Sequence, residues 1–116
     1  MVRKGIDMEK EVRERMRDGK GTVEIAHIFK QDELKGRARL VAKVTLPPGS
    51  SIGFHRHEDE EEIFYILRGR GLVDDNGTMR TVEPGDAVLT GGGSGHSIEN
   101  VGEDPLEMIA VILLFV

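Results

Sequence analysis

From Gly21 onward the chain alternates apolar and polar positions in short runs, which glycine, proline and asparagine separate. A period of two is typical of strands that bury one face, and about nine short strands at this spacing predict an all-β sandwich or barrel. The runs are Thr22–Lys30, Arg37–Leu46, Ile52–His57, Glu62–Arg68, Gly71–Asp74, Thr78–Val82, Ala87–Thr90, His96–Val101 and Leu106–Val116. Between two of them, Asn76 and Gly77 predict a tight hairpin turn, because both residues tolerate a positive φ.

The first twenty residues have a different pattern. Asp7 is a suitable helix N-cap, Gly19 a suitable stop, and the apolar residues Met8, Val12 and Met16 lie four apart. This spacing predicts a short surface helix over residues 7–17 with a narrow apolar stripe, and a partly ordered arm is the alternative.

The length of 116 residues suits one domain. We expect an arm or short helix over residues 1–20 and one barrel domain over residues 21–116. The net charge of -5 argues against a nucleic-acid partner and against an anionic membrane surface, since both require a basic face. The longest apolar run, Met108–Val116, is about half the length that a bilayer span needs. The start, Met1-Val-Arg-Lys-Gly5, is not followed by an apolar signal segment, which predicts a cytoplasmic location.

Candidate chemistry is concentrated between residues 49 and 100. His55 and His57 lie two residues apart, so on a strand both side chains project from one face, roughly 7 Å apart. Glu62 follows five residues later, and His96 lies beyond a glycine-rich turn. Imidazole with carboxylate suits a divalent transition metal better than calcium or magnesium. The chain has no cysteine, so only histidine and acidic side chains are available as metal ligands.

These segments resemble the two motifs of the cupin superfamily. The first motif appears without departure as Gly49, His55, His57, Glu62 and Gly69 at the family's spacing. The second appears as Gly85, Gly93, His96 and Asn100, with Gly91 in place of the expected proline.

The resemblance implies a single-domain jelly-roll β-barrel in which His55, His57, Glu62 and His96 hold a divalent metal. Other segments are similar to small cupins grouped with the oxalate decarboxylase branch, which uses manganese. We therefore expect manganese and a small carboxylate such as oxalate, with iron, nickel or zinc as alternative ions. Three imidazoles and one carboxylate leave a divalent ion with a net charge of about +1 that attracts a small anion. A cupin dioxygenase or isomerase, and a non-catalytic ligand-binding module, remain open, so whether the protein is an enzyme is not decided.

The sequence offers only candidates for a general acid or base, namely Glu60 and His27. Within the acidic run, Glu58, Asp59, Glu60 and Glu61 are expected to be solvated, with an inclination of Glu60 over the site as the alternative. His27 is expected to be a hydrogen-bonded core or interface residue rather than a fifth ligand. Arg39, Lys43 and Thr45 alternate with apolar residues; they face solvent, an interface or, if turned inward, a substrate carboxylate.

The apolar strands predict an oligomer. Thr22–Lys30 and Met108–Val116 carry more apolar side chains than one barrel face can cover. A second copy of the chain would hide both these side chains and exposed strand edges, so we expect a homodimer. The resemblance implies the same state, since cupins commonly dimerise and sometimes exchange their N-terminal strands.

Overall fold

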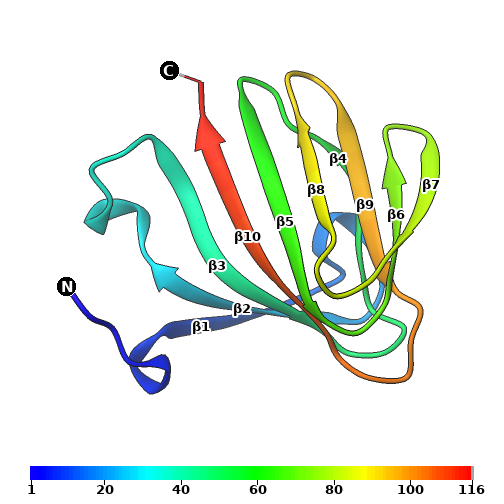
Figure 1. Cartoon of the computed structure of the whole chain (residues 1–116), viewed down its shortest axis with the longest axis horizontal. Coiled ribbons are helices and arrows are strands. Elements are labelled where there is room, and N and C mark those ends of the chain that lie inside the picture. Colours follow the sequence, from blue (N-terminus) through cyan, green and yellow to red (C-terminus); the bar gives the residue numbers. More distant parts are fainter. Residues whose placement is uncertain (116) are drawn as a thin grey trace.

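The computed structural model describes residues 1–115, which form two antiparallel sheets facing one another (Figure 1). The larger sheet has the strand order β1-β2-β3-β10-β5-β8, and the smaller has the order β4-β9-β6-β7. The strands are β1 (Glu9–Glu14), β2 (Thr22–Phe29), β3 (Ala38–Leu46), β4 (Ser51–Arg56), β5 (Glu60–Arg68), β6 (Gly71–Asp75), β7 (Thr78–Val82), β8 (Ala87–Gly91), β9 (Gly95–Asn100) and β10 (Leu106–Leu114). The all-β jelly-roll prediction is confirmed.

Each of the nine predicted runs forms one of the strands β2 to β10. Their ends agree to within two residues, and Val116, the last residue of the predicted final run, lies outside the described residues. The turn between β6 and β7 has the expected conformation, with φ of 49° at Asn76 and 101° at Gly77. The turn chemistry and the period of two were therefore sufficient to locate these strands.

The predicted N-terminal helix is wrong. Glu9–Glu14 forms β1, which pairs along its whole length with β2, and short 3-10 turns at Gly5–Asp7 and Met16–Asp18 flank it. A helix here would bury only three apolar side chains, whereas a strand satisfies the otherwise unpaired backbone edge of β2. Nor is the segment a loose arm, since Met16 packs against the core. Within residues 1–115, no helix is long and apolar enough to cross a membrane.

The core lies between the two sheets and consists of side chains from alternate strand positions. Strand β5 shows the alternation clearly: Glu62, Phe64 and Ile66 are buried, while Tyr65 between them is 46% exposed. Tyr65 therefore points away from the interior, as expected. The same alternation places the polar end of the inner face, at Glu62, above an apolar floor that begins with Phe64.

Candidate metal centre

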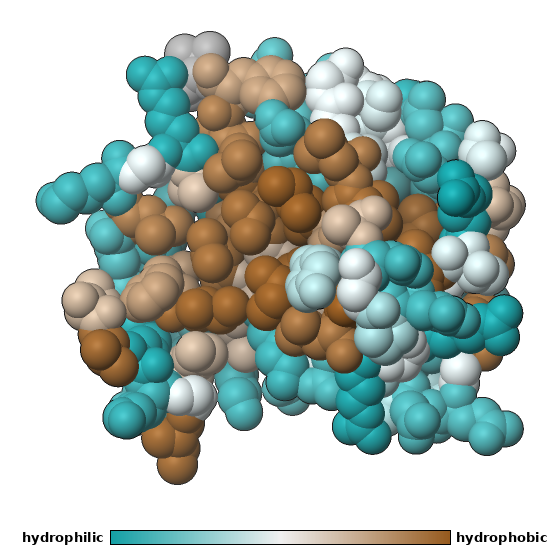
Figure 2. All heavy atoms as spheres, viewed as in Figure 1, coloured by the Kyte–Doolittle hydropathy of each residue, from teal (hydrophilic) through white to brown (hydrophobic). Residues whose placement is uncertain are grey.

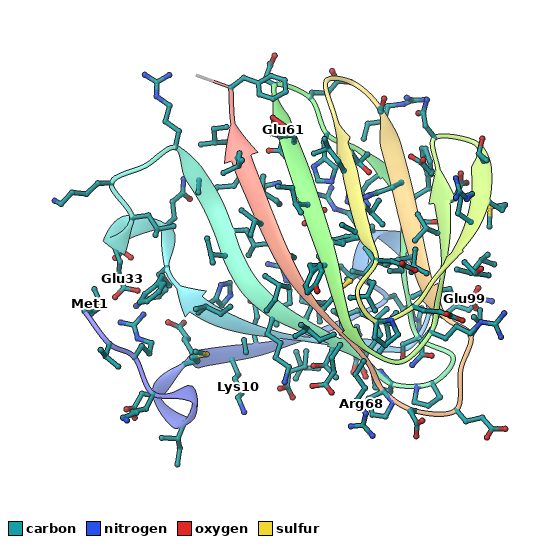
Figure 3. All side chains as sticks on the ribbon, viewed as in Figure 1. Met1, Lys10, Glu33, Glu61, Arg68 and Glu99 are labelled. Atoms are coloured by element: carbon teal, nitrogen blue, oxygen red, sulfur yellow. The ribbon has the colours of Figure 1, made fainter. Side chains whose placement is uncertain are left out.

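Four side chains converge inside the barrel near one end of β5. His55 comes from β4, His57 follows β4 directly, Glu62 comes from β5 and His96 from β9. Their candidate ligand atoms all lie within 4.8 Å of one another. His57, Glu62 and His96 are 2%, 5% and 1% exposed, and His55 is half-buried. Glu61, labelled in Figure 3, marks the end of β5 at which the centre lies.

The spacing of these atoms fits a shared cation. Glu62 Oε1 lies 3.0 Å from His57 Nε2 and 3.1 Å from His96 Nε2, and the two Nε2 atoms are 3.1 Å apart. Two ligands about 2.1 Å from one ion and at a right angle to each other lie about 3 Å apart. A buried triangle of lone-pair atoms at this separation needs a proton or a cation between its members. The residues present therefore fit a divalent metal.

The hydrogen bonds made by the Nδ1 atoms of His55 and His57 determine that Nε2 of each ring faces the centre. His55 Nδ1 donates to the carbonyl oxygen of Gly53 at 2.8 Å, and His57 Nδ1 donates to Glu60 Oε2 at 2.5 Å. Both acceptors lack a proton of their own, so each Nδ1 carries the hydrogen and each Nε2 keeps its lone pair for the centre. His96 Nδ1 is buried without a partner among residues 1–115, and so is the hydroxyl of Thr90.

Apolar and aromatic packing fixes the rings. Phe64 stacks on His96 with the ring centroids 4.8 Å apart and the planes 10° from parallel. The three imidazoles meet edge to face, at centroid separations of 4.8 to 4.9 Å. His96 is thus held by a stacked ring below and two imidazoles beside it, which limits its rotation.

The environment shifts the pKa of His55, His57 and Glu62. Burial lowers the pKa of His55, and the hydrogen bond to Glu62 raises the pKa of His57. Burial opposes ionisation of Glu62, but hydrogen bonds from His57 and His96 together outweigh it and lower the pKa of that carboxyl. The centre therefore keeps its carboxylate charged despite its burial, as a metal ligand must be.

The two candidates for acid–base chemistry lie in different places. Both oxygens of Glu60 are engaged, by the hydrogen bond from His57 and by Arg39, whose Nε and Nη2 donate at 2.7 and 2.9 Å. His27 lies outside the four-residue cluster, on β2, with Nε2 3.3 Å from Glu11 Oε1. His27 is a partly exposed sheet residue that hydrogen-bonds to β1, and Glu60 contacts a candidate ligand rather than the centre itself.

Arg39 is the residue of the site whose role the sequence left open. Its position in the alternation of β3 matches that of the outward residues Lys43 and Thr45, yet its side chain reaches an inward acid. The cause is an irregularity in the pairing of β3 with β10, which the sequence pattern did not reveal.

The structure explains two positions of the second motif: Gly91, which departs from the family pattern, and Asn100, which agrees with it. At Gly91 an added Cβ would lie 2.5 Å from the backbone oxygen of Glu60, so neither proline nor alanine fits where β8 approaches β5. Asn100 holds three backbone segments together. Its side-chain amide donates to the backbone oxygens of Leu46 and Asp104, each at 2.8 Å, and its side-chain oxygen accepts from the backbone N–H of Gly102 at 2.9 Å. Gly91 therefore reflects close packing, and Asn100 closes the loop that follows β9.

Comparison with known proteins identifies the family. Residues 42–112 match the model of the cupin domain family. The chain is a cupin. It is 50% identical over 99 residues to the oxalate-binding protein of Thermotoga maritima, across 85% of this chain and 82% of that protein. It also superposes on the crystal structure of a predicted oxalate decarboxylase from Thermotoga maritima, with a TM-score of 0.94 and 46% identity, covering 98% of this chain and 99% of that one.

A solved structure of lower sequence identity shares the fold alone. The polyketide cyclase RemF from Streptomyces resistomycificus matches 100% of this cupin and 80% of its own chain, with a TM-score of 0.79 but only 19% identity. The resemblance predicted from the two motifs is therefore confirmed at the level of family and fold, and the similarity to oxalate-related relatives extends over nearly the whole chain.

Proposed function

We propose that this cupin binds a divalent metal through His55, His57, Glu62 and His96 and uses that ion to bind a small carboxylate such as oxalate. The observation that carries the proposal is the buried cluster, in which three imidazoles and one ionised carboxylate converge within 4.8 Å. The similarity to an oxalate-binding protein over most of both chains supports oxalate as the ligand.

The chemistry divides between the ion and the protein. When bound, the ion supplies positive charge and Lewis acidity toward the carboxylate oxygens. Glu62 cancels only one of its two charges, so a favourable field for an anion remains. Phe64 closes the floor beneath His96, and His55 is the one half-buried member of the four. We propose manganese as the resident ion, on the resemblance to the oxalate decarboxylase branch. Iron, nickel and zinc are the alternatives, because ligand type alone does not separate these metals.

Decarboxylation is the second candidate, and the similarity to a predicted oxalate decarboxylase favours it. Cleavage of oxalate to carbon dioxide and formate needs a proton at the new carbon–hydrogen bond, hence a group that can deliver one. Glu60 hydrogen-bonds to one residue of the cluster, and its oxygens are held by Arg39 and His57. This engagement favours binding over catalysis as the primary function.

One set of measurements separates these functions. Protein purified without added metal is analysed for its elements, then loaded with Mn²⁺, Fe²⁺, Ni²⁺ or Zn²⁺ and titrated calorimetrically with oxalate, with succinate as a longer dicarboxylate control. We expect oxalate binding that requires the metal. Formation of formate and carbon dioxide from oxalate would establish the decarboxylase instead, and absence of metal binding would refute the proposal.

We also propose a homodimer. The outward residues Phe29, Val41, Val111, Ile63 and Leu89 pair across five neighbouring strands and form an apolar row. Figure 2 shows hydrophobic side chains gathered over this face, which Figure 1 identifies as the outside of the larger sheet. A second copy is the occupant that covers such a surface symmetrically. Sedimentation is expected to give a dimer; a cytoplasmic location stays a prediction from the sequence.

A further inference from the structure

The side chain of Arg39 is turned inward by a bulge in β3. Leu40 pairs with Ile112 and Ala38 pairs with Leu113, so Arg39 is an extra residue with no counterpart on β10. A bulge re-aims side chains, and such irregularities often lie beside functional sites. Without it, Arg39 would share the outer face with Val41 and would point away from the barrel interior.

From this position the guanidinium reaches past β10 to β5. Its Nε and Nη2 atoms donate to the two oxygens of Glu60 at 2.7 and 2.9 Å, which is a planar, two-point contact. Glu60 Oε2 in turn accepts from His57 Nδ1 at 2.5 Å. Side-chain exposure falls along this chain of contacts, from 37% at Arg39 through 12% at Glu60 to 2% at His57. The three residues form a continuous connection between the surface and the centre.

We propose that Arg39 and Glu60 are positioning residues for the metal centre. Glu60 fixes the ring of His57 with Nε2 directed to the ion, and Arg39 fixes Glu60. The proposal rests on the proposed function, since it concerns how tightly the ion is held. A lysine could not replace Arg39, because a single ammonium group cannot contact both carboxylate oxygens in one plane.

The contact with Arg39 also keeps the second acid out of the centre. Glu60 lies on the same face of β5 as Glu62, two residues away, and its oxygen is already within hydrogen-bonding distance of a candidate ligand. Released from Arg39, this carboxylate would add a second uncompensated negative charge beside the ion, and the net charge that attracts an anion would fall from about +1 to about zero. Arg39 is thus expected to support oxalate binding through the net charge of the centre, whereas its effect on metal binding comes from the positioning of Glu60.

The test compares metal dissociation constants, measured by competition with a chelator, among Glu60→Ala, Glu60→Gln, Arg39→Ala, Arg39→Lys and the double variant Arg39→Ala/Glu60→Ala. Glu60→Ala is expected to weaken binding about 10- to 100-fold, the range seen when an outer partner of a metal ligand is lost. Arg39→Ala is expected to weaken it about 10-fold, with Arg39→Lys similar. Glu60→Gln is expected to lose less than Glu60→Ala, because its amide oxygen still accepts from His57.

The double variant separates positioning from general stability. If Arg39 acts through Glu60, removing it in the Glu60→Ala background has no further effect on metal affinity; independent, additive losses would overturn the proposal. Glu61→Gln, on the opposite face of β5 (Figure 3), and Arg68→Ala, at its far end, serve as matched controls and are expected to bind metal like the wild type.

A second readout does not depend on metal. In metal-free protein labelled with ¹⁵N, the short bond predicts a slowly exchanging downfield proton on Nδ1 of His57 that disappears in Glu60→Ala. Its persistence in Glu60→Ala would overturn the positioning role. If the wild type shows this proton but binds no metal, the proposed function fails while the contact stands. If the wild type binds metal and all variants bind it equally, the positioning proposal alone fails.

Discussion

Both faces of β5 carry acidic and apolar residues, but the two faces have different surroundings. On the inner face, Glu60 and Glu62 have defined partners, and Phe64 stacks beneath the centre. On the outer face, Tyr65 and Leu67 are 46% and 43% exposed on a sheet surface with many apolar side chains. The comparison shows that burial with specific partners, rather than residue type, separates a candidate site from a surface.

The largest effect is expected from removing the floor of the inner face. Phe64→Ala should lower the free energy of unfolding by about 3–5 kcal/mol, because it leaves a cavity beneath His96. Leu67→Ala, on the outer face of the same strand, should change it by about 0.5 kcal/mol or less. Urea denaturation of the metal-free variants, at the same protein concentration for each, measures both free energies of unfolding. Equal losses would contradict the assignment of the two faces.

The outer face is expected to matter for association rather than for folding. Val111 lies in the middle of the apolar row, between Val41 and Ile63. Val111→Glu should raise the dimer dissociation constant at least about 100-fold, because dimerisation would bury an unpaired charge. Analytical ultracentrifugation measures the constant, with Val101→Glu, at an exposed loop position, as the control. A dimer of unchanged affinity would place the interface elsewhere.

The smallest effect is expected at a second arginine–glutamate pair, which lies at the surface. Arg3 donates to Glu33 at 2.6 Å, and this bond, assisted by the backbone N–H of Lys30, lowers the pKa of Glu33 from 4.5 to about 2. Since the folded value lies below the unfolded one, the pair stabilises the fold above pH 4.5 and loses this contribution as the pH falls toward 2.

Arg3→Ala should return the pKa of Glu33 most of the way to 4.5, as followed by carboxyl ¹³C NMR. The urea midpoint at pH 7 should hardly move, because solvent reaches both side chains, which are 20% and 18% exposed, and screens the pair. A value that stays near 2 in the variant would show that Lys30, not Arg3, determines the shift. Glu60, by contrast, contacts both an arginine and the buried His57, and comparing the two pairs tests whether contact with a buried residue gives such a pair its importance.

The strands and the four cluster residues were predictable because each depends on a local regularity. Alternation located β2 to β10, and fixed spacings singled out Glu62 from the neighbouring acids. The N-terminal strand was not predictable, since residues 7–17 carry a helical spacing and form β1 only because β2 offers an unpaired edge.

The inward turn of Arg39 and the engagement of Glu60 were also beyond the sequence. Both depend on one extra residue in the pairing of β3 with β10, and a shift of one position reverses the face to which a side chain points. A period-two pattern assigns Arg39 to the surface, and only the three-dimensional pairing shows otherwise. Such irregularities are invisible locally because they arise between strands that lie far apart in the chain.

The most direct test of the central claim compares two adjacent acids on opposite faces of β5. Wild type, Glu62→Gln and Glu61→Gln are stripped of metal and titrated calorimetrically with Mn²⁺, after circular dichroism has confirmed that all three are folded. We predict one ion per chain for the wild type and Glu61→Gln, and affinity reduced more than about 100-fold in Glu62→Gln. Equal binding by Glu62→Gln and the wild type, or no binding by the wild type, would contradict the account.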